Sequence, residues 1–217
     1  MKNIFKKSLA VFSSILTVGL IAASGITASA QELRNGDTNS DGVVNLYDAV
    51  NISKHVMGDA SLEGDALIMA DYNKDSKVNI YDAVFVARYI LAEGKLNELA
   101  TLINTTRMLN NAMGLEFDQT LTDAAMKRAA ELPNKFSGDY RPDGSDFFTI
   151  FAEYDIAYES CATCVAAVPA TPEEVLSAFL GSSTVRTKLM SDQYTKIGIG
   201  YCGMNDDYKH YWAVLLI

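Results

Sequence analysis

Two twelve-residue stretches of the chain carry oxygen-bearing side chains at the same positions. The first is D-T-N-S-D-G-V-V-N-L-Y-D at 37–48, and the second is D-Y-N-K-D-S-K-V-N-I-Y-D at 71–82. Positions 1, 3, 5, 9 and 12 are Asp or Asn in both, and position 7 can add its backbone carbonyl. A hard cation such as calcium takes six to eight oxygens at about 2.3–2.6 Å, and a loop with this spacing wraps them around one point. The alternative is a pair of Asx-rich turns without a metal. We therefore expect two calcium ions, with these ligands: Asp37, Asn39, Asp41, Val43, Asn45 and Asp48 in the first loop; Asp71, Asn73, Asp75, Lys77, Asn79 and Asp82 in the second.

Each loop runs directly into a stretch with apolar residues at helical spacing. Ala49, Ile52 and Val56 follow the first loop, and Ala83, Val86 and Ile90 follow the second, so each stretch predicts an amphipathic helix. No helical pattern precedes either loop. Position 6, where the sharp turn favours positive φ, is Gly42 in the first loop and Ser76 in the second. The second calcium site is therefore expected to be the weaker one.

This duplicated loop-helix unit resembles a type I dockerin over residues 35–93. The resemblance rests on the repeated register, on the Val before each ninth-position Asn (Val44 and Val78), and on the missing leading helices. It implies an all-α, EF-hand-like domain at 33–95 (the loop-helix half) whose partner is a cohesin of a cellulosome scaffold. In dockerins, the residues at loop positions 10 and 11 and on the exposed face of the following helix contact the partner. The corresponding residues here are Leu46, Tyr47, Lys54 and His55, and Ile80, Tyr81, Arg88 and Tyr89.

The two sets of recognition residues are near copies of each other. The resemblance thus implies two pseudo-symmetric faces, either of which can meet a cohesin. The alternative is that the apolar pairs at loop positions 10 and 11 belong to the core of the domain.

The first thirty residues have the pattern of a secretory signal peptide. Three lysines (Lys2, Lys6 and Lys7) precede an apolar run at 9–23, and Ala28-Ser29-Ala30 offers a small-residue cleavage site. Cleavage after Ala30 is expected, and an uncleaved anchor is the alternative. No later apolar run is long enough to cross a bilayer, so we expect a secreted protein with no membrane span after cleavage.

The charge of the chain argues against nucleic acid as a partner. The formal net charge is −9, and loss of residues 1–30 removes three lysines and no acidic residue. Binding to nucleic acid or to an anionic surface by counterion release needs the opposite balance.

Three cysteines, Cys161, Cys164 and Cys202, leave several states open. One possibility is a disulfide between Cys202 and either of the other two, and another is a fully reduced chain. C-A-T-C has redox spacing but lacks the strand-to-helix setting that depresses a thiol pKa, so redox catalysis is not expected.

The remainder of the chain, after a short linker at 93–95, alternates helical and strand patterns. Thr171, Pro172 and Glu174 form the start signals of a helix that ends at Gly181. The last strand is apolar on both faces, as in a sheet covered by helices on both sides. This order predicts a three-layer α-β-α sandwich. The expected helices lie from residue 98 onward, at about 119–132, at 172–181 and at 186–190; a polar loop spans 134–149, and strands span 196–202 and 210–217.

These pieces resemble a bacterial member of the CAP superfamily (cysteine-rich secretory, antigen 5, pathogenesis-related) over 97–217 (the sheet half). The matching segments, in the family's order, are L-I-N-T-T-R at 102–107, G-L at 114–115, R-A-A-E at 128–131, R-P-D-G-S at 141–145, T-P-E-E-V at 171–175, I-G-I-G-Y at 197–201 and Y-W at 211–212.

The resemblance also implies a cavity that this sequence has lost. Many relatives line it with two His and acidic residues and can hold zinc. The first His corresponds to Gly138-Asp139, the Glu of a G-E-N motif falls at Ala162-Thr163-Cys164, and the second His is Val185 beside Arg186. Glu159 lies close to the position of the family's Glu, so the alignment leaves open which residue corresponds to it. The Trp that usually precedes the second His is replaced by Phe179.

The chemistry of the residues leads to the same expectation. Zinc sites usually include imidazole, and after residue 55 the chain has one histidine, His210, on the last expected strand. No elbow motif supports a nucleophile paired with that histidine. Asp139, Asp143 and Glu159 could form a carboxylate pair, although acids in a polar loop are usually solvated. No zinc and no catalytic residue are expected.

The sequence therefore favours a secreted, calcium-dependent docking protein with a non-catalytic CAP-like domain that binds an unidentified ligand or has a structural role. One alternative is a cellulosomal hydrolase or peptidase that acts on cell-wall polysaccharide or protein with carboxylates of the CAP-like cleft. Another is a calcium protein unrelated to scaffolds. Because metal binding is coupled to folding in one half only, removal of calcium is expected to unfold 35–93 and to leave the sheet folded.

Overall fold

A computed structural model of the chain describes residues 33–204 and 209–217. The expected signal peptide at 1–30 lies outside these residues. These described residues belong to one compact unit by their contacts. Among the described residues, no helix combines the length and apolar composition needed to cross a membrane.

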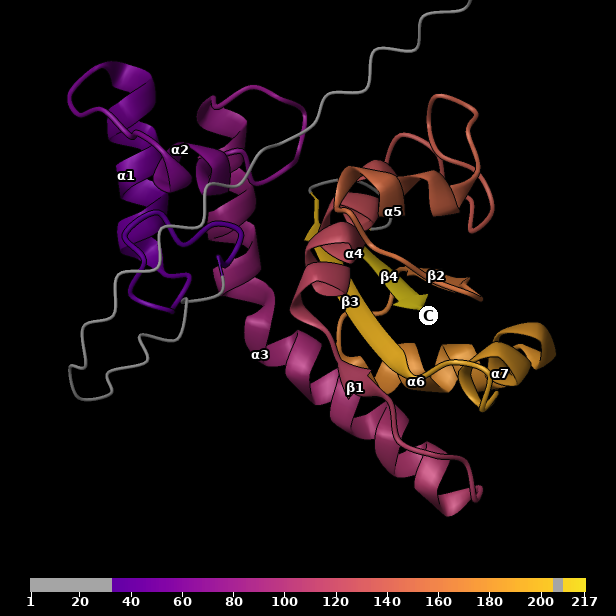
Figure 1. Cartoon of the computed structure of the whole chain (residues 1–217). Helices are drawn as coiled ribbons and strands as arrows, with labels where there is room; N and C mark the ends of the chain where they lie inside the picture. Colours follow the sequence, from indigo (N-terminus) through magenta and orange to yellow (C-terminus); the bar gives the residue numbers. More distant parts are fainter. Residues whose placement is uncertain (1–32, 205–208) are drawn as a thin grey trace, which may run out of the picture. The chain divides into compact units, whose positions relative to one another are not determined.

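The loop-helix half contains two capped helices after its two loops (Figure 1). In α1 (Leu46–Met57) and α3 (Ile80–Leu109), an Asn caps the start and the Asp at the third helical position completes a capping box. The same two residues are positions 9 and 12 of each loop. The short helix α2 (Asp65–Ala70) lies in the segment between the copies, where no helix was expected.

Helix α3 is thirty residues long and continues from the loop-helix half into the sheet half. The expected linker at 93–95 is therefore wrong, because these residues are helical. The segment around Gly94 is rich in helix-forming residues and contains no proline. Buried Ala92, Leu96 and Leu99 anchor it to the interior.

The sheet half is built on four strands in the order β1-β3-β4-β2. The parallel pair is β1 (Glu116–Phe117) with β3 (Lys196–Gly203), and the antiparallel pairs join β4 (His210–Leu216) to β3 and to β2 (Ala162–Ala167). The strands expected at 196–202 and 210–217 are thus present. Strand β2 was not expected from the sequence, because the C-A-T-C segment was interpreted only for the spacing of its cysteines.

Helices cover both faces of this sheet. Trp212, Val214 and Leu216 of β4 belong to one core cluster with residues of α3, α6 (Pro172–Gly181) and α7 (Ser183–Leu189). The alternate β4 residues face α4 (Gln119–Glu131) and the region of the short helices η1 (Phe147–Thr149) and α5 (Ile150–Glu153). This arrangement explains why β4 is apolar on both sides. The start of α6 follows the expectation, since Thr171 and Glu174 form the capping box and Pro172 is the first helical residue.

The first core cluster also extends into the loop-helix half. Val44, Ile52, Tyr72 and Val86 belong to the same buried cluster as Leu99 and Trp212. The two halves therefore share one hydrophobic core rather than meeting through a flexible connection.

Two glycines of β3 allow α4 to lie against the sheet. A Cβ at Gly198 would overlap the backbone of Leu121, and a Cβ at Gly200 would overlap that of Ala125. The I-G-I-G-Y segment is thus a packing surface for a helix backbone.

Gly200→Ala should therefore lower the free energy of unfolding by about 3 kcal/mol or more, because neither backbone can move without disrupting the core. Gly94→Ala is the matched control. It lies in mid-helix with no atom within 4 Å of the added Cβ, and it should raise stability by up to about 1 kcal/mol. Urea unfolding monitored by circular dichroism measures both, and similar effects for the two substitutions would contradict this packing.

Candidate functional site

The two loops fold with the same hydrogen bonds at their first position. The carboxylate of Asp37 accepts from the backbone N–H groups of Asp41 (3.2 Å) and Gly42 (2.8 Å). In the second loop, Asp71 accepts in the same way from Asp75 (3.1 Å) and Ser76 (2.9 Å). These bonds curl each loop around its first carboxylate.

The last position closes each loop. Asp48 is fully buried and accepts from the N–H groups of Thr38 (2.9 Å) and Asn45 (2.9 Å). Asp82 is equally buried and accepts from Asn73 (3.2 Å) and Asn79 (2.8 Å). Position 12 therefore joins the start of each loop to the start of the following helix.

The residues of the second loop fit a hard cation. Burial raises the pKa of the Asp82 carboxyl, and the negative charges of Asp71 and Asp75 raise it further. A divalent ion among these three carboxylates would offset their mutual repulsion. Among the described residues no three His, Cys, Asp or Glu side chains form a compact metal cluster, so the Asn and main-chain oxygens of the loops are needed to complete a coordination shell.

The loops differ at position 6 in residue type but not in backbone conformation. Gly42 has φ 86° and Ser76 has φ 67°. A non-glycine residue in this left-handed region costs about 1–2 kcal/mol. The structure thus places a small strain in the second loop, and the weaker calcium affinity of that loop stays a prediction.

A larger difference lies at position 2. Thr38 of the first loop donates its hydroxyl to Asp48, within the loop (3.1 Å). Tyr72 of the second loop is buried against the sheet half and donates its hydroxyl to Asp123 of α4 (3.0 Å). Sequence reasoning passed over Tyr72 because position 2 is not a metal ligand.

The apolar pairs at loop positions 10 and 11 are exposed, so their assignment to the core is wrong. The exposed fractions are 65% for Leu46, 75% for Tyr47, 49% for Ile80 and 67% for Tyr81. These side chains can contact a partner.

Each pair begins an exposed stripe along its helix. In α1 the stripe continues from Tyr47 through Val50 and Lys54 to Met57, and in α3 it continues from Tyr81 through Val84 and Arg88 to Leu91. The spacings of three, four and three residues keep each stripe on one helix face. Arg88 is half-buried and lies 5.9 Å from the centroid of the Phe85 ring. Val50, Met57, Val84 and Leu91 were missed, although the helical spacing from Tyr47 and Tyr81 would have found them.

Two of the expected partner-binding residues lie elsewhere. Tyr89 is 2% exposed, and its hydroxyl accepts from Arg34 (3.0 Å) and donates to Gln119 of α4 (3.3 Å). The Nδ1 atom of His55, a half-buried residue, accepts from the N–H of Leu62 (3.1 Å). Tyr89 therefore belongs to the interior and not to a docking face.

At the positions of the CAP cavity, the side chains are small or apolar. A Cβ at Gly138 would meet the methyl groups of Thr163 and Val165. Thr163 is buried, and its carbonyl accepts from Lys188 (3.2 Å). Phe179 is buried at the position of the usual Trp. None of the residues assigned to this cavity carries an imidazole, and the one carboxylate among them, that of Asp139, is on an exposed residue.

The expected carboxylate candidates are not oriented toward each other by any hydrogen bond among the described residues. The carboxylate of Asp143 accepts from the backbone and hydroxyl of Ser145, while Asp139 is exposed and its backbone carbonyl accepts from Phe147. Glu159 lines a separate shallow pocket with Gln193 and Lys196.

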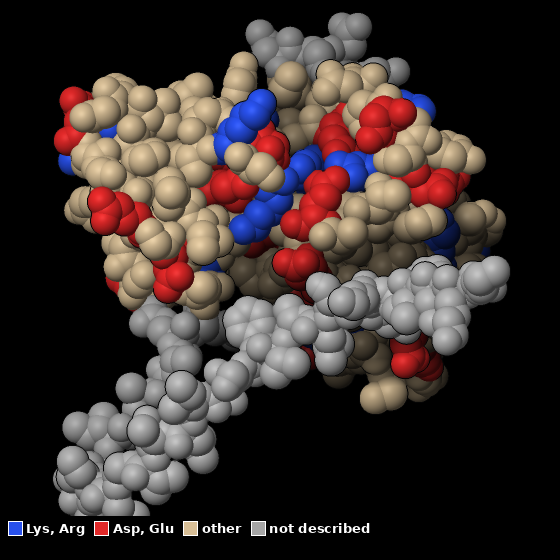
Figure 2. Space-filling view, turned by 45° about the horizontal axis from the view of Figure 1, so that its top comes forward, with Lys and Arg blue, Asp and Glu red and all other residues tan. Residues whose placement is uncertain are grey.

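The arginine of the R-P-D-G segment has a structural role. Arg141 pairs with Glu131 (2.6 Å) and with Glu153. On the face shown in Figure 2, acidic and basic side chains are interspersed rather than separated. That face therefore has no large patch of a single charge.

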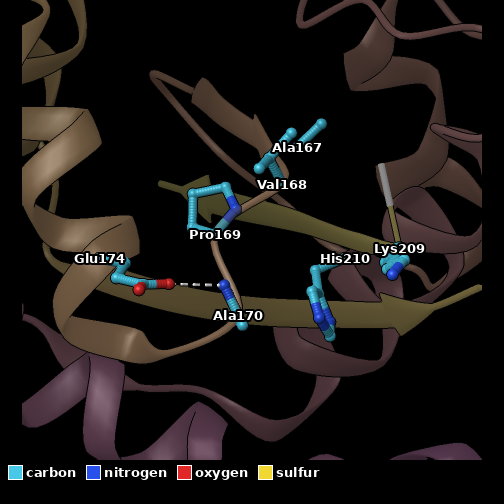
Figure 3. Close-up of a pocket in the computed structure, with 7 residues that line it drawn as sticks. All are labelled: Ala167, Val168, Pro169, Ala170, Glu174, Lys209 and His210. Atoms are coloured by element: carbon cyan, nitrogen blue, oxygen red, sulfur yellow. Dashed lines mark hydrogen bonds between the residues drawn. The ribbon is translucent and has the colours of Figure 1, made fainter. Parts of the chain in front are cut away.

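His210 lies at an open pocket between the end of β2 and the start of α6 (Figure 3). Its Nδ1 atom lies 2.7 Å from the hydroxyl of Tyr201, and burial, with Lys95 and Lys209, lowers the pKa of its imidazole. Glu174 of the same pocket accepts from the N–H of Ala170 (2.8 Å). These two polar side chains already have structural partners, which agrees with the interpretation of His210 as a strand position.

All three cysteines are free thiols, so of the states left open by the sequence the structure has the reduced one. Cys164 and Cys202 belong to core clusters on opposite faces of the sheet. Cys161 lies at the end of β2 that is remote from Cys202, about 20 Å along the strand direction. A disulfide needs Cα atoms within about 7 Å, so neither expected bridge to Cys202 can form in this fold.

Comparison with known proteins identifies both halves. The family model described as "Cysteine-rich secretory protein family" (CAP) matches residues 100–216, more than half of the chain. The chain belongs to the CAP family. The model of the dockerin type I domain matches residues 35–91, so a type I dockerin domain precedes the CAP domain.

Individual relatives match between 48% and 58% of the chain. An uncharacterized protein of Bacillus subtilis, YkwD, is 27% identical over 105 residues, 48% of this chain and 41% of that protein. The structure of an extracellular SCP-domain protein of Bacillus anthracis has 22% identity and a TM-score of 0.51, over 58% of this chain and 40% of that one. An outer surface protein of Borrelia burgdorferi has 22% identity and a TM-score of 0.52, over 58% of this chain and 92% of that one. The structural likeness shows the fold alone, and the chain spans less than half the length of the two Bacillus proteins.

The thiol arrangement predicts a simple labelling result. With Ellman's reagent the native chain should react at Cys161 alone, because Cys164 and Cys202 are buried. Burial raises the pKa of Cys161, so labelling should be faster at pH 9 than at pH 7, and Cys161→Ser should abolish it. Denatured, unreduced chain should show all three thiols; a lower number would reveal a disulfide.

The Tyr72–Asp123 contact predicts a pH dependence of stability. Burial raises the pKa of Asp123 to about 7, above the value of about 4 in an unfolded chain. The stabilisation linked to its proton is complete below pH 4 and is lost as the pH rises through 7. Asp123→Asn keeps an oxygen that can accept from Tyr72, so its melting temperature should change less between pH 5 and pH 8. Parallel profiles for variant and wild type, at one fixed calcium concentration, would contradict the assignment.

Proposed function

We propose that this chain is an extracellular, cellulosome-associated protein that docks on a scaffold cohesin through its dockerin domain and carries a non-catalytic CAP domain. The observation that carries the proposal is the pair of exposed stripes, which start at the same loop position in each copy and present matching side chains. Tyr47 and Tyr81 are both more than 60% exposed, and large exposed apolar patches on soluble proteins usually mark interaction sites. An extracellular location agrees with the names of the Bacillus anthracis and Borrelia relatives, an extracellular protein and an outer surface protein.

Calcium has a structural role in this proposal. Each loop would hold one ion through the side chains at positions 1, 3, 5, 9 and 12 and the carbonyl at position 7. The bound ion supplies a fixed positive charge that offsets the loop carboxylates. Asp48 and Asp82 then hold the first turns of α1 and α3, where the two stripes begin. The dockerin would thus be an EF-hand-like pair of loop-helix units, and its partner-binding faces would depend on calcium through these two residues.

The CAP domain is proposed to bind a ligand or protein, or to support the dockerin, within a three-layer α-β-α sandwich. By the resemblance, Gly138-Asp139, Thr163 and Val185 stand where relatives place the cavity residues, so the two histidines are absent and Asp139 alone carries a carboxylate. The carboxylates of Glu131 and Glu153 are paired with Arg141, so they are not available as a general acid and base.

Assays of the purified protein on plant polysaccharides and on protein substrates test the non-catalytic assignment. No turnover is expected on either class of substrate. Turnover that is abolished by Asp139→Ala would overturn the assignment and favour a carboxylate-based hydrolase.

The two stripes predict redundant docking. Alanine at Leu46 and Tyr47 should leave binding to a cohesin from the same organism within about a factor of two, because the second stripe remains and only one of two equivalent modes is lost. Alanine at Ile80 and Tyr81 alone should do the same. Alanine at all four should abolish binding, measured by calorimetry in calcium.

Met113→Ala and Phe136→Ala are matched controls, since both side chains are more than half exposed in the CAP domain. They should bind as the unchanged protein does, and a chelator should abolish binding in every case. Cohesin binding that survives the fourfold substitution would show that the stripes are not the docking faces.

A further inference from the structure

The second calcium loop is held by the CAP domain from outside. Tyr72, between the first two ligand positions, is 1% exposed and donates its hydroxyl to Asp123 (3.0 Å). Its backbone carbonyl accepts from Asn35 (2.9 Å) and from the hydroxyl of Tyr154, which directly follows α5 (3.5 Å). The CAP domain therefore contacts Tyr72 at two points, with Asp123 at its hydroxyl and Tyr154 at its main-chain carbonyl, while Asn35 of the dockerin bonds to the same carbonyl.

The next residue, the ligand Asn73, is held as well. Its backbone carbonyl accepts from Lys127 of α4 (2.5 Å). Lys127 is itself paired with Glu153 (2.8 Å), and Glu153 with Arg141. The position of this ligand is thus connected to an ion-pair network inside the CAP domain.

The far end of the same loop is fixed through α3. Asp82 belongs to the first turn of α3, and the buried residues of that helix continue to Arg107 in the CAP domain. Both ends of the second loop are consequently attached to elements of the CAP core.

The first loop has less direct support from the CAP domain: its Val44 lies in the shared core, and Arg34, which also bonds to Tyr89, donates to the carbonyl of Gly42 (3.2 Å). Its residue Thr38 bonds to Asp48 and Asn51, and Asn39 is exposed. Among the hydrogen bonds between described residues, none joins 37–48 to α4 or α5. The two loops, so similar in sequence, differ in what surrounds them.

We propose that the CAP domain preorganises the second calcium loop, so that calcium bound there and the folded CAP domain stabilise each other, while the first loop binds calcium independently. A loop whose ligands are already in place loses less conformational entropy when the ion binds. The coupling acts in both directions, because each partner stabilises the other by the same free energy. This support also offsets the strain at Ser76. The inference rests on the proposed binding of calcium by both loops.

This coupling replaces the expectation that chelation leaves the sheet folded and unchanged. Removal of calcium from the second loop frees Asp71–Asn73 and weakens the contacts of Tyr72 and Lys127. The stability of the CAP domain should then depend on calcium through one loop and not through the other.

Full-length chains with one intact loop test the proposal. Asp37→Ala leaves the second loop and Asp71→Ala leaves the first. In the Asp37→Ala chain, Tyr72→Phe and Lys127→Met should each weaken calcium binding about tenfold by calorimetry. In the Asp71→Ala chain, the same two substitutions should leave the affinity unchanged. Lys135→Met, which removes an exposed CAP lysine near Tyr140, is the control and should be neutral in both chains.

The reverse direction has its own readout. Trp212 is the only tryptophan of the chain and is fully buried in β4, so its fluorescence follows unfolding of the CAP domain. Calcium should raise the Trp212 melting temperature of the Asp37→Ala chain by several degrees and leave that of the Asp71→Ala chain almost unchanged.

The outcomes separate the two proposals. If neither single-loop chain binds calcium, both the calcium-dependent function and the coupling are wrong. If both chains bind calcium but Tyr72→Phe and Lys127→Met have no effect on the second loop, the coupling alone is wrong. Tyr72→Phe removes only a hydroxyl and serves as the decisive variant if Lys127→Met does not fold. Equal effects of calcium on Trp212 in the two chains also overturn the coupling.

Discussion

The carboxylate of Asp82 closes the second loop and also starts the longest helix among the described residues. It accepts hydrogen bonds from the N–H groups of Asn73 and Asn79. Asp82 is at once the last position of the loop and a residue of the first turn of α3. Because α3 continues to Leu109, the same helix carries one exposed stripe at its start and part of the CAP core at its end. The dockerin and CAP domains are therefore successive in sequence but share a structural element and a buried core.

This sharing makes the two copies of the loop-helix unit unequal. Their ligands, caps and exposed stripes are nearly identical, which is what a repeated sequence predicts. Their surroundings are not identical, since Tyr72 and Tyr89 of the second copy are buried with Asp123 and Gln119 of α4. The corresponding residues of the first copy, Thr38 and His55, make contacts within the loop-helix half. The two copies thus present matching exposed stripes, while attachment to the CAP domain gives one of them a different environment.

The sequence was informative wherever local chemistry decides the structure. The repeated Asp and Asn positions, the Thr171–Glu174 capping box and the two-sided burial of β4 could be predicted because each depends on neighbouring residues or on a simple period. The continuity of α3 through Gly94 could not, because burial of Leu96 and Leu99 outweighs the low helix propensity of one glycine. Burial of Tyr89, whose hydroxyl bonds to Gln119 of α4, is likewise a tertiary effect. The separation of the cysteines on the two faces of the sheet became visible only once β2 was placed.

The central claim is that calcium in the second loop stabilises both domains through α3 and α4. Amide hydrogen exchange of the full chain, with and without calcium, tests it most directly, because it resolves protection along the sequence. The account predicts that calcium increases protection at 71–82, along α3 beyond Ala92 and into α4 near Asp123 and Lys127. A gain in protection that ends at about residue 91, with the CAP domain unchanged, would contradict it.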